Sequence, residues 1–335
     1  MEKKLVVANI GMKFGMSHVE GAMSCNAEIG AICDCDKEAL EFAGKRYDIP
    51  EDRWFTDYRD LLDNESIDVV TVAIPDQQHV QVSKEFLRAG KHVLCEKPLA
   101  LTREDLKDII EAEKESDARF MVGQICRFTP AFIKAKELID SGIIGEIYYV
   151  ESEYAHDYMY LVDNWRQDPK RHGVIGGGCH AVDLLRWLAG DPEEVMAYGT
   201  HKLLPQVAYD DATIAIMKFP NDVIGKVFVS TGCKRDYTMR TLIYGTKGTI
   251  ICDNTSPTMQ LFVIGDDEMA HEPEIIDIEV NNHNAAAEFS VFADAILNNT
   301  PVATNALEGA KTVEVCLAIV KASETGCPVK PDYNF

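Results

Sequence analysis

A lysine in the tripeptide Glu96-Lys97-Pro98 is well placed for chemistry in this sequence. An apolar run from His92 to Cys95 ends abruptly in this carboxylate, ammonium and proline. In an open α/β sheet, charged side chains at the carboxyl end of a buried strand point into the ligand crevice. Proline stops the strand and fixes the backbone beside the lysine. The alternative is a surface ion pair that only closes the strand.

A histidine forms the second candidate group. His180 follows the three glycines 176–178 and is expected to open a helix, and Asp183 lies three residues further on. The two side chains then share a helical face, so the carboxylate could orient the imidazole or bind a substrate hydroxyl. The alternatives are a core histidine satisfied by the backbone and a carboxylate that interacts with the helix dipole.

The elements that must position these groups differ between the two parts of the chain. Apolar runs at 5–10, 29–33, 69–74, 92–95 and 120–122 alternate with helical patterns at 18–23, 37–46, 80–89 and 103–115. This alternation predicts βαβ units and a parallel, doubly wound sheet over residues 1–125.

Residues 126–335 are expected to form a second domain of α+β type. After a helix at 130–141, strand patterns follow at 147–155, 195–201, 212–219, 224–230, 241–244 and 249–252, with a helix at 181–189. Clustered strands with few helices between them predict a large, open, mostly antiparallel sheet. Closing helices at 285–297 and 307–324 would cover a sheet or dock back on the first domain.

The first strand runs into Gly11-Met12-Lys13-Phe14-Gly15. Glycines at a strand-to-helix turn let the backbone approach a pyrophosphate, and the helix N-terminus favours its charge. The usual spacing is G-x-G-x-x-G, so this loop lacks the middle glycine, and a plain tight turn is the alternative. Lys13 could contact a phosphate directly or stay solvated.

An acidic residue about 20 positions beyond the glycine loop would bind a ribose. Asp34 stands there, whereas Asp36 is expected to cap the next helix. Asp34 followed by Cys35, with no arginine for a 2′-phosphate, favours NAD over NADP. Ile74, Pro75 and His79, at the end of another strand, could contact the nicotinamide ribose or form a turn.

Bulk properties narrow the class of partner. The chain has 335 residues and a net charge of -22, which repels nucleic acid and anionic membrane. No stretch approaches the ~18–20 apolar residues that span a bilayer, and we do not expect the N-terminal stretch to act as a signal peptide. Ten scattered cysteines without a C-x-x-C pair indicate reduced thiols in a cytoplasmic protein.

Taken together, these segments resemble the Gfo/Idh/MocA family of glucose-fructose oxidoreductase and inositol dehydrogenase type. The resemblance covers nearly the whole chain. It rests on residues 11–18, Asp34, 75–79, 90–99, 122–128, 165–169 and 176–183. It implies an N-terminal Rossmann domain, a C-terminal domain whose sheet often supports homo-oligomers, NAD(H) or NADP(H) as cofactor, and sugars, cyclitols or related polyols as substrates.

The resemblance also implies roles for particular residues. Lys97 and His180 would work at the reacting carbinol, with Glu96 and Lys97 near the cofactor. Hydride transfer needs a general base at the hydroxyl, for which histidine is suited, and lysine can offset developing negative charge on the same oxygen. The family commonly carries an aspartate four residues before this histidine, whereas this chain has Gly176.

The missing aspartate leaves other reactions open. Asp183, Glu153 or Asp157 could take its role, or Lys97 and His180 could act without it. A glycosidase or lyase that oxidises a sugar transiently with no net redox change is one alternative. A regulatory protein that binds NAD without catalysis is another, but it would be expected to lose Lys97 or His180.

Polar and aromatic residues between the two halves suit a sugar ring. The substrate-binding candidates are Arg127, Tyr154, His156, Trp165 and Arg166, besides Lys97, His180 and Asp183. Aromatic residues are more commonly packing residues, which is the alternative. A metal site is not expected, because the spacing of His156, Asp157, His172, His180 and Asp183 matches no strong template.

Overall fold

The computed structural model describes residues 4–162, 164–269 and 271–335, which fall into two compact units. The first comprises residues up to Gln124, the segment Asn284–Ala310 and Phe335; the second comprises Ile125–His283 and Lys311–Asn334. Residues 1–3, part of the N-terminal stretch discussed above, lie outside the described residues.

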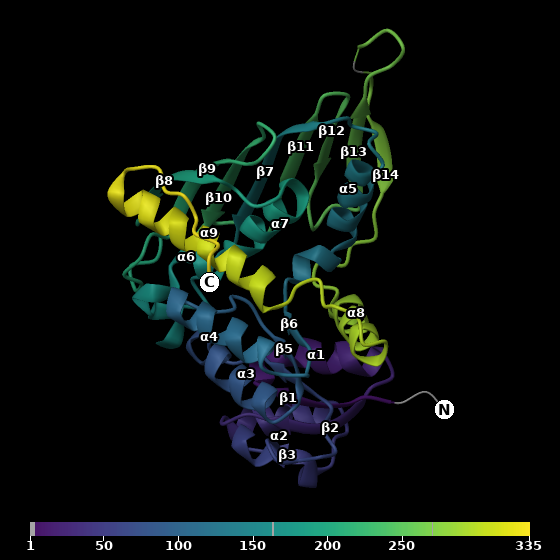
Figure 1. Ribbon diagram of the computed structural model, residues 1–335, viewed down its shortest axis with the longest axis vertical. Helices are drawn as coiled ribbons and strands as arrows, with labels where there is room; N and C mark the ends of the chain where they lie inside the picture. Colours follow the sequence, from purple (N-terminus) through teal and green to yellow (C-terminus); the bar gives the residue numbers. More distant parts are fainter. Residues whose placement is uncertain (1–3, 163, 270) are drawn as a thin grey trace. The chain divides into compact units, whose positions relative to one another are not determined.

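The first unit is built on a six-stranded parallel sheet (Figure 1). Its strands are β1 (Val6–Ile10), β2 (Glu28–Cys33), β3 (Trp54–Phe55), β4 (Val69–Val72), β5 (His92–Cys95) and β6 (Phe120–Val122). Its helices are α1 (Met12–Ser24), α2 (Lys37–Arg46), α3 (His79–Arg88), α4 (Arg103–Lys114) and α8 (Ala285–Leu297). The strand order β3-β2-β1-β4-β5-β6 is that of a Rossmann fold, so the expected fold class is confirmed.

Local sequence explains why these elements form. All four residues of β4 are buried, as expected for a strand covered by helices on both faces of a parallel sheet. Asp36 accepts hydrogen bonds from the backbone N–H groups of Glu38 and Ala39 and so caps α2, as expected. Thr102 caps α4 in the same way through the N–H of Asp105.

The second unit contains an eight-stranded sheet in the order β14-β13-β12-β11-β7-β10-β9-β8. The strands are β7 (Ile147–Ala155), β8 (Glu194–Thr200), β9 (Ala212–Lys218), β10 (Ile224–Ser230), β11 (Thr241–Gly245), β12 (Gly248–Cys252), β13 (Thr258–Val263) and β14 (Glu274–Asp277). Every pairing is antiparallel except that of β7 with β10, which confirms the expected mostly antiparallel sheet.

Helices α5 (Pro130–Asp140), α6 (Gly173–Gly176) and α7 (Cys179–Ala189) belong to the same unit. Helix α7 packs against β7 and β10. Helix α9 (Ala306–Thr325) begins in the first unit and continues in the second. Among the described residues, no helix has the length and apolar character needed to cross a membrane.

The structure differs from expectation in three strands and one helix. Strands β3, β13 and β14 were not expected, and α1 begins at Met12, directly after the first strand, rather than near His18. Gly15 therefore lies in the first turn of a helix instead of in a loop. The helix starts early because Gly11 adopts a φ of 91°, which turns the chain sharply without a side chain in the way.

Candidate active site

The glycine turn lies at the point where the strand order of the parallel sheet reverses, between β1 and β4. A Cβ atom at Gly11 would lie 2.2 Å from the carbonyl oxygen of Ala73, at the end of β4, so only glycine fits. Gly11, which precedes helix α1, provides no side-chain cap, and the first turn of the helix contains no acidic residue. The positive end of the helix dipole, near Met12, Lys13, Phe14 and Gly15, favours an anion at this turn.

Asp34 lies at the end of the neighbouring strand β2. Its Oδ2 accepts a hydrogen bond from the backbone N–H of Met12 at 2.6 Å, and its Oδ1 accepts one from that of Asp36 at 2.8 Å. The carboxylate thus fixes the glycine turn against the end of β2. The ammonium of Lys13 forms an ion pair with Asp36 at 2.8 Å, and this hydrogen bond lowers the pKa of Asp36.

His79 is buried behind the end of β4. Its Nδ1 lies 2.8 Å from the carbonyl oxygen of Pro98, and its Nε2 lies 2.9 Å from that of Ile74. Carbonyl oxygens only accept, so both ring nitrogens donate and the imidazole is charged. Burial opposes this charge, but the Cys95 thiol, the Asp76 carboxylate and the Pro98 carbonyl raise the pKa of His79 to about 10.

Through these contacts His79 links the segment after β4, which contains Ile74 and Pro75, to the Glu96-Lys97-Pro98 tripeptide after β5. We expected the side chain of His79 to reach the cofactor. Its ring contacts favour a positioning role instead.

The Glu96-Lys97-Pro98 tripeptide follows β5, next to β4 in the sheet. The backbone N–H of Glu96 donates to the carbonyl of Val72 at 2.9 Å, and the Lys97–Pro98 peptide bond is cis. The Glu96 carboxylate accepts from the backbone N–H of Lys97 at 3.1 Å and lies 2.9 Å from Nε2 of His18 on α1. Lys97 therefore leaves the sheet at the same edge as Gly11.

The pair formed by His18 and Glu96 is ionic. Burial disfavours both charges, but the hydrogen bond and the charge of His18, aided by Lys97 and His79, lower the pKa of Glu96 to about 2. For His18 burial is likewise outweighed by the hydrogen bond to Glu96 and by the charges of Glu96 and Glu288, which raise the pKa of His18.

Glu288 on α8 is a buried carboxyl group that sequence reasoning missed. It is fully buried, and neither of its oxygens has a hydrogen-bond partner among the described residues. Burial and the negative charge of Glu96 raise the pKa of Glu288 to about 8, against the opposing effect of His18. Glu288 is therefore largely protonated at neutral pH. Its only signal in the sequence is a lone carboxylate in the apolar run at 285–293.

His180 belongs to the second unit, at the start of α7, and is 2% exposed. Its Nδ1 lies 3.4 Å from Sγ of Cys126, in the short helix η4 (Ile125–Phe128). The ring of Tyr154, on β7, stacks on the imidazole with centroids 5.9 Å apart. His180 is thus buried between the ring of Tyr154 and the sulfur of Cys126. The sequence did not identify Cys126 as a member of the site.

Asp183 forms a buried ionic network one helical turn beyond His180. Arg127 donates from Nε to Oδ2 at 2.8 Å and from Nη2 to Oδ1 at 2.7 Å, and the hydroxyl of Thr312 also donates to Oδ1, at 2.9 Å. We expected Asp183 to orient His180 or bind substrate, and Arg127 to bind substrate. Because each group is held by the other, the network favours a role in fixing α7 against η4 and α9.

Position 176, where the family's aspartate is missing, faces a guanidinium group. A Cβ atom at Gly176 would lie 2.2 Å from Nη1 of Arg171, and Nη2 of Arg171 donates to the carbonyl of Gly176 at 3.3 Å. Arg171 is itself buried, and its guanidinium lies 5.1 Å from the ring centroid of Trp165. The guanidinium of Arg171 thus occupies the space in which the side chain of the family's aspartate would begin.

The remaining substrate candidates lie in the same unit. The hydroxyl of Tyr154 is 2.6 Å from that of Tyr158 and 3.2 Å from Nδ1 of His156. The guanidinium of Arg166 stacks on Trp165 at 4.0 Å from the ring centroid. Among the described residues, no three His, Cys, Asp or Glu side chains are grouped as metal ligands would be.

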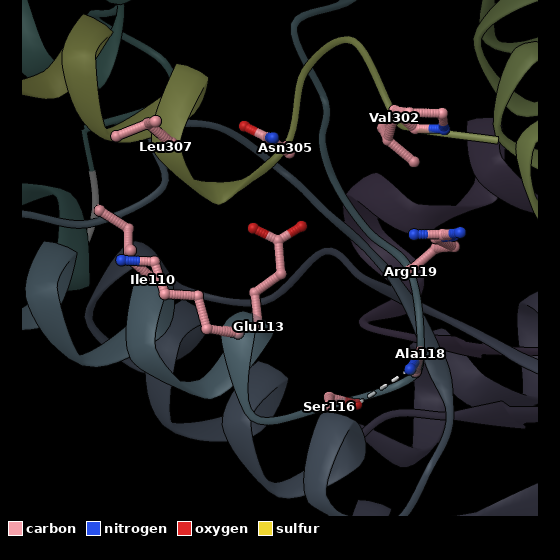
Figure 2. Close-up of a pocket in the computed structure, with 10 residues that line it drawn as sticks. Ile110, Glu113, Ser116, Ala118, Arg119, Val302, Asn305 and Leu307 are labelled. Carbon is pink, nitrogen blue, oxygen red and sulfur yellow. Dashed lines mark hydrogen bonds between the residues drawn. The ribbon is translucent and has the colours of Figure 1, made fainter.

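A hollow of about 290 Å³ lies elsewhere in the first unit, between α4 and residues 301–307 (Figure 2). Glu113, Arg119 and Asn305 are among its lining residues. The Glu113 carboxylate accepts from the backbone N–H of Ala306 at 3.1 Å, at the start of α9, and burial raises the pKa of Glu113 to about 7. This contact gives Glu113 a structural role as a helix cap.

A doubly wound sheet with a glycine turn at its switch point defines a dinucleotide-binding protein. Comparison with family models agrees: residues 5–124 match "Oxidoreductase family, NAD-binding Rossmann fold", and residues 132–251 match "GFO/IDH/MocA C-terminal domain". The chain belongs to the Gfo/Idh/MocA family of oxidoreductases, as the sequence motifs indicated.

Individual relatives span the whole length of the chain. It is 26% identical to the uncharacterized oxidoreductase YrbE of Bacillus subtilis strain 168, over 100% of this chain and 98% of the relative. It is also 26% identical to inositol 2-dehydrogenase of Salmonella paratyphi B, with 99% of each chain covered. Levoglucosan dehydrogenase in complex with NADH and levoglucosan has the same fold, with a TM-score of 0.88, 24% identity and 98% and 100% coverage.

Proposed function

We propose that this protein is an NAD(H)-dependent dehydrogenase that transfers a hydride between nicotinamide and a carbinol carbon of a sugar, cyclitol or related polyol. One observation carries this proposal. Lys97 emerges at the carboxyl end of β5, at the same sheet edge where the glycine turn follows β1 and accommodates no side chain. The names inositol 2-dehydrogenase and levoglucosan dehydrogenase among its relatives support the substrate class.

The residues of the first unit fit a dinucleotide. The N-terminus of α1, from Met12 to Gly15, would hold the pyrophosphate, with Lys13 beside it. Asp34 would accept hydrogen bonds from the adenosine ribose, which favours NAD over NADP because a carboxylate repels a 2′-phosphate. Ile74, Pro75 and Glu96 would border the nicotinamide end, with His79 holding their backbone. When bound, NAD would accept the hydride or return it.

Lys97 and His180 would act on the substrate. The ammonium of Lys97 would hydrogen-bond the carbinol oxygen and offset negative charge that develops there. His180 would take the hydroxyl proton as the hydride leaves the same carbon, and would return it in the reverse direction. Tyr154, His156, Trp165 and Arg166 would contact the ring faces and hydroxyls of the substrate, while Arg127 and Asp183 hold the helix that carries His180.

A redox-neutral glycosidase or lyase of the same fold is the second candidate. The contact between Arg171 and Gly176 favours it, because a guanidinium group lies where the usual carboxylate partner of the histidine would begin. Such an enzyme would oxidise a sugar carbon transiently, cleave the glycosidic bond and then return the same hydride to the product.

A substrate panel separates these two functions. The purified protein would be incubated with NAD and with sugars, cyclitols and aryl glycosides, while NADH absorbance and aglycone release are followed together. NADH formed from a free sugar or cyclitol supports the dehydrogenase. Aglycone release without net NADH supports the second candidate. The absence of both signals with every member of the panel would contradict the proposal.

The proposal extends to assembly and location. The face of the second unit's sheet carries exposed Tyr198, Ile216 and Ile224, with exposed fractions of 69%, 58% and 54%. A second copy of the chain would cover this apolar surface, giving a homo-oligomer. All ten cysteines lie among the described residues and are free thiols, which supports a reducing, cytoplasmic location. The first unit would bind the dinucleotide, and the second would supply substrate binding and the oligomer interface.

A further inference from the structure

A sulfur atom lies beside Nδ1 of the histidine at the proposed reaction centre. Nδ1 of His180 lies 3.4 Å from Sγ of Cys126, and each of the two residues is 2% exposed. The contact joins the start of α7 to the short helix η4, which precedes α5. A buried ring nitrogen needs a hydrogen-bond partner, so this contact bears on which nitrogen of His180 carries the proton.

A second neighbour of Cys126 offers an acceptor for its thiol hydrogen. Sγ of Cys126 lies 3.4 Å from Sδ of Met239, which also accepts a hydrogen bond from the hydroxyl of Tyr237 at 3.1 Å. A thioether carries no hydrogen and can only accept. With the thiol hydrogen of Cys126 directed to Met239, the sulfur lone pairs are left to accept from Nδ1 of His180.

We propose that Cys126 is a positioning residue for His180, whose sulfur accepts the Nδ1–H and so leaves Nε2 as the proton-accepting nitrogen. The assignment of Nε2 as the base rests on the proposed function. In the forward direction the hydroxyl proton passes to Nε2, the hydride leaves the same carbon for the nicotinamide ring, and a carbonyl group forms. The resulting imidazolium keeps its Nδ1–H on the sulfur.

Other titratable groups surround this pair. They are Cys179 and Asp183 on α7, Arg127 on η4, Tyr154 on β7, Tyr237 and His283. The charge of Asp183 is balanced by Arg127, which holds both of its oxygens. The ring of His283 lies 6.0 Å from that of His180. Burial, the charge of Cys126 and the hydrogen bond of Tyr237 to Cys126 raise the pKa of Tyr237 well above its usual value, so the phenol stays neutral and remains a donor.

Two substitutions test the role of the sulfur. Cys126→Ala removes the acceptor, whereas Cys126→Ser replaces it with a hydroxyl that still accepts. Cys252→Ala, at another buried cysteine of the same unit, on β12, is the matched control. The tautomer of His180 would be read from the ¹⁵N shifts of its ring in histidine-labelled protein, with His180→Gln used to assign the signals. Turnover would be measured with the best substrate of the panel.

The wild-type enzyme, Cys126→Ser and Cys252→Ala are expected to carry the proton of neutral His180 on Nδ1. In Cys126→Ala a large part of this proton should move to Nε2, kcat should fall about tenfold at nearly constant KM, and the acid limb of the pH profile should move to lower pH. The acid limb moves because the imidazolium of His180 loses a hydrogen-bond acceptor, which lowers the pKa of His180. Damage to packing alone would leave the tautomer and the limb in place.

Two results would overturn the proposal: protonation of Nε2 in neutral wild-type His180, or an unchanged tautomer in Cys126→Ala. The ring shifts need no turnover, so they remain decisive if no polyol is oxidised, an outcome that contradicts the proposed function alone. If Cys126→Ala does not fold, the wild-type enzyme and Cys126→Ser still decide, since both must hold the proton on Nδ1.

Discussion

The guanidinium of Arg171 occupies the space that any side chain at Gly176 would need, with Nη1 2.2 Å from the position of a Cβ atom. Gly176→Ala should therefore displace Arg171 and break its hydrogen bond to the Gly176 carbonyl. We expect a loss of about 1–2 kcal/mol in the free energy of unfolding. Thermal denaturation measures this loss, and the double variant Arg171→Ala/Gly176→Ala should show no additional cost from Gly176→Ala. Equal costs of Gly176→Ala with and without Arg171 would refute the steric relationship.

The buried carboxyl of Glu288 predicts a pH-dependent stability. The pKa of Glu288 is about 8 in the folded protein against an ordinary value of 4.5, so the folded state keeps a proton that the unfolded chain releases. Its favourable contribution is complete below about pH 4.5 and is lost as the pH rises through about 8, at a total of several kcal/mol.

Glu288→Gln removes this titration and should be more stable than the wild type above pH 8, with a much smaller difference near pH 5. Melting temperatures measured across this range check the prediction. Asp294→Asn, on the exposed side of the same helix, serves as the control. A constant difference between Glu288→Gln and the wild type at all pH values would rule out the titration of Glu288.

His79 also predicts a stability that falls as the pH rises, here because a buried group keeps a positive charge. The pKa of His79 is about 10 in the folded protein against an ordinary value of 6.5, so its contribution to stability is complete below about pH 6.5 and is lost as the pH rises through about 10. His79→Phe leaves two buried carbonyl groups without their donors and should cost about 2–5 kcal/mol at pH 6.

The cost of His79→Phe should shrink towards pH 10, as followed by chemical denaturation at several pH values. The exposed His271 provides the control substitution His271→Phe. A cost that stays the same or grows with pH would show that the His79 imidazole is neutral in the folded protein.

The local sequence was enough to predict most of the fold and the residues that lie at strand ends. Gly11 and Lys97 each follow a short apolar run, so their places at the edge of the parallel sheet follow from the βαβ pattern. Strand β3 was missed because it has only two residues, and β14 because it is largely exposed.

Contacts between distant segments could not be predicted in this way. Glu288 reaches the sheet of the first unit only because the segment 284–310 folds back onto it. The contacts of Cys126 with His180 and of Arg171 with Gly176 depend on side-chain packing, which no spacing reveals. Residue types indicated the chemistry, whereas tertiary packing determines which groups hold His180 and Glu96 in place.

The central claim, that Lys97 acts at the reacting oxygen, is tested most directly by Lys97→Met, with turnover of the best panel substrate and NADH binding measured on the same preparation. Lys107→Met, at an exposed lysine on α4, is the matched control. We predict a fall in kcat of about 10²–10⁴-fold in Lys97→Met, with the dissociation constant of NADH within a few-fold of the wild type. Turnover of Lys97→Met at the level of the control would contradict a role for Lys97 at the reacting oxygen.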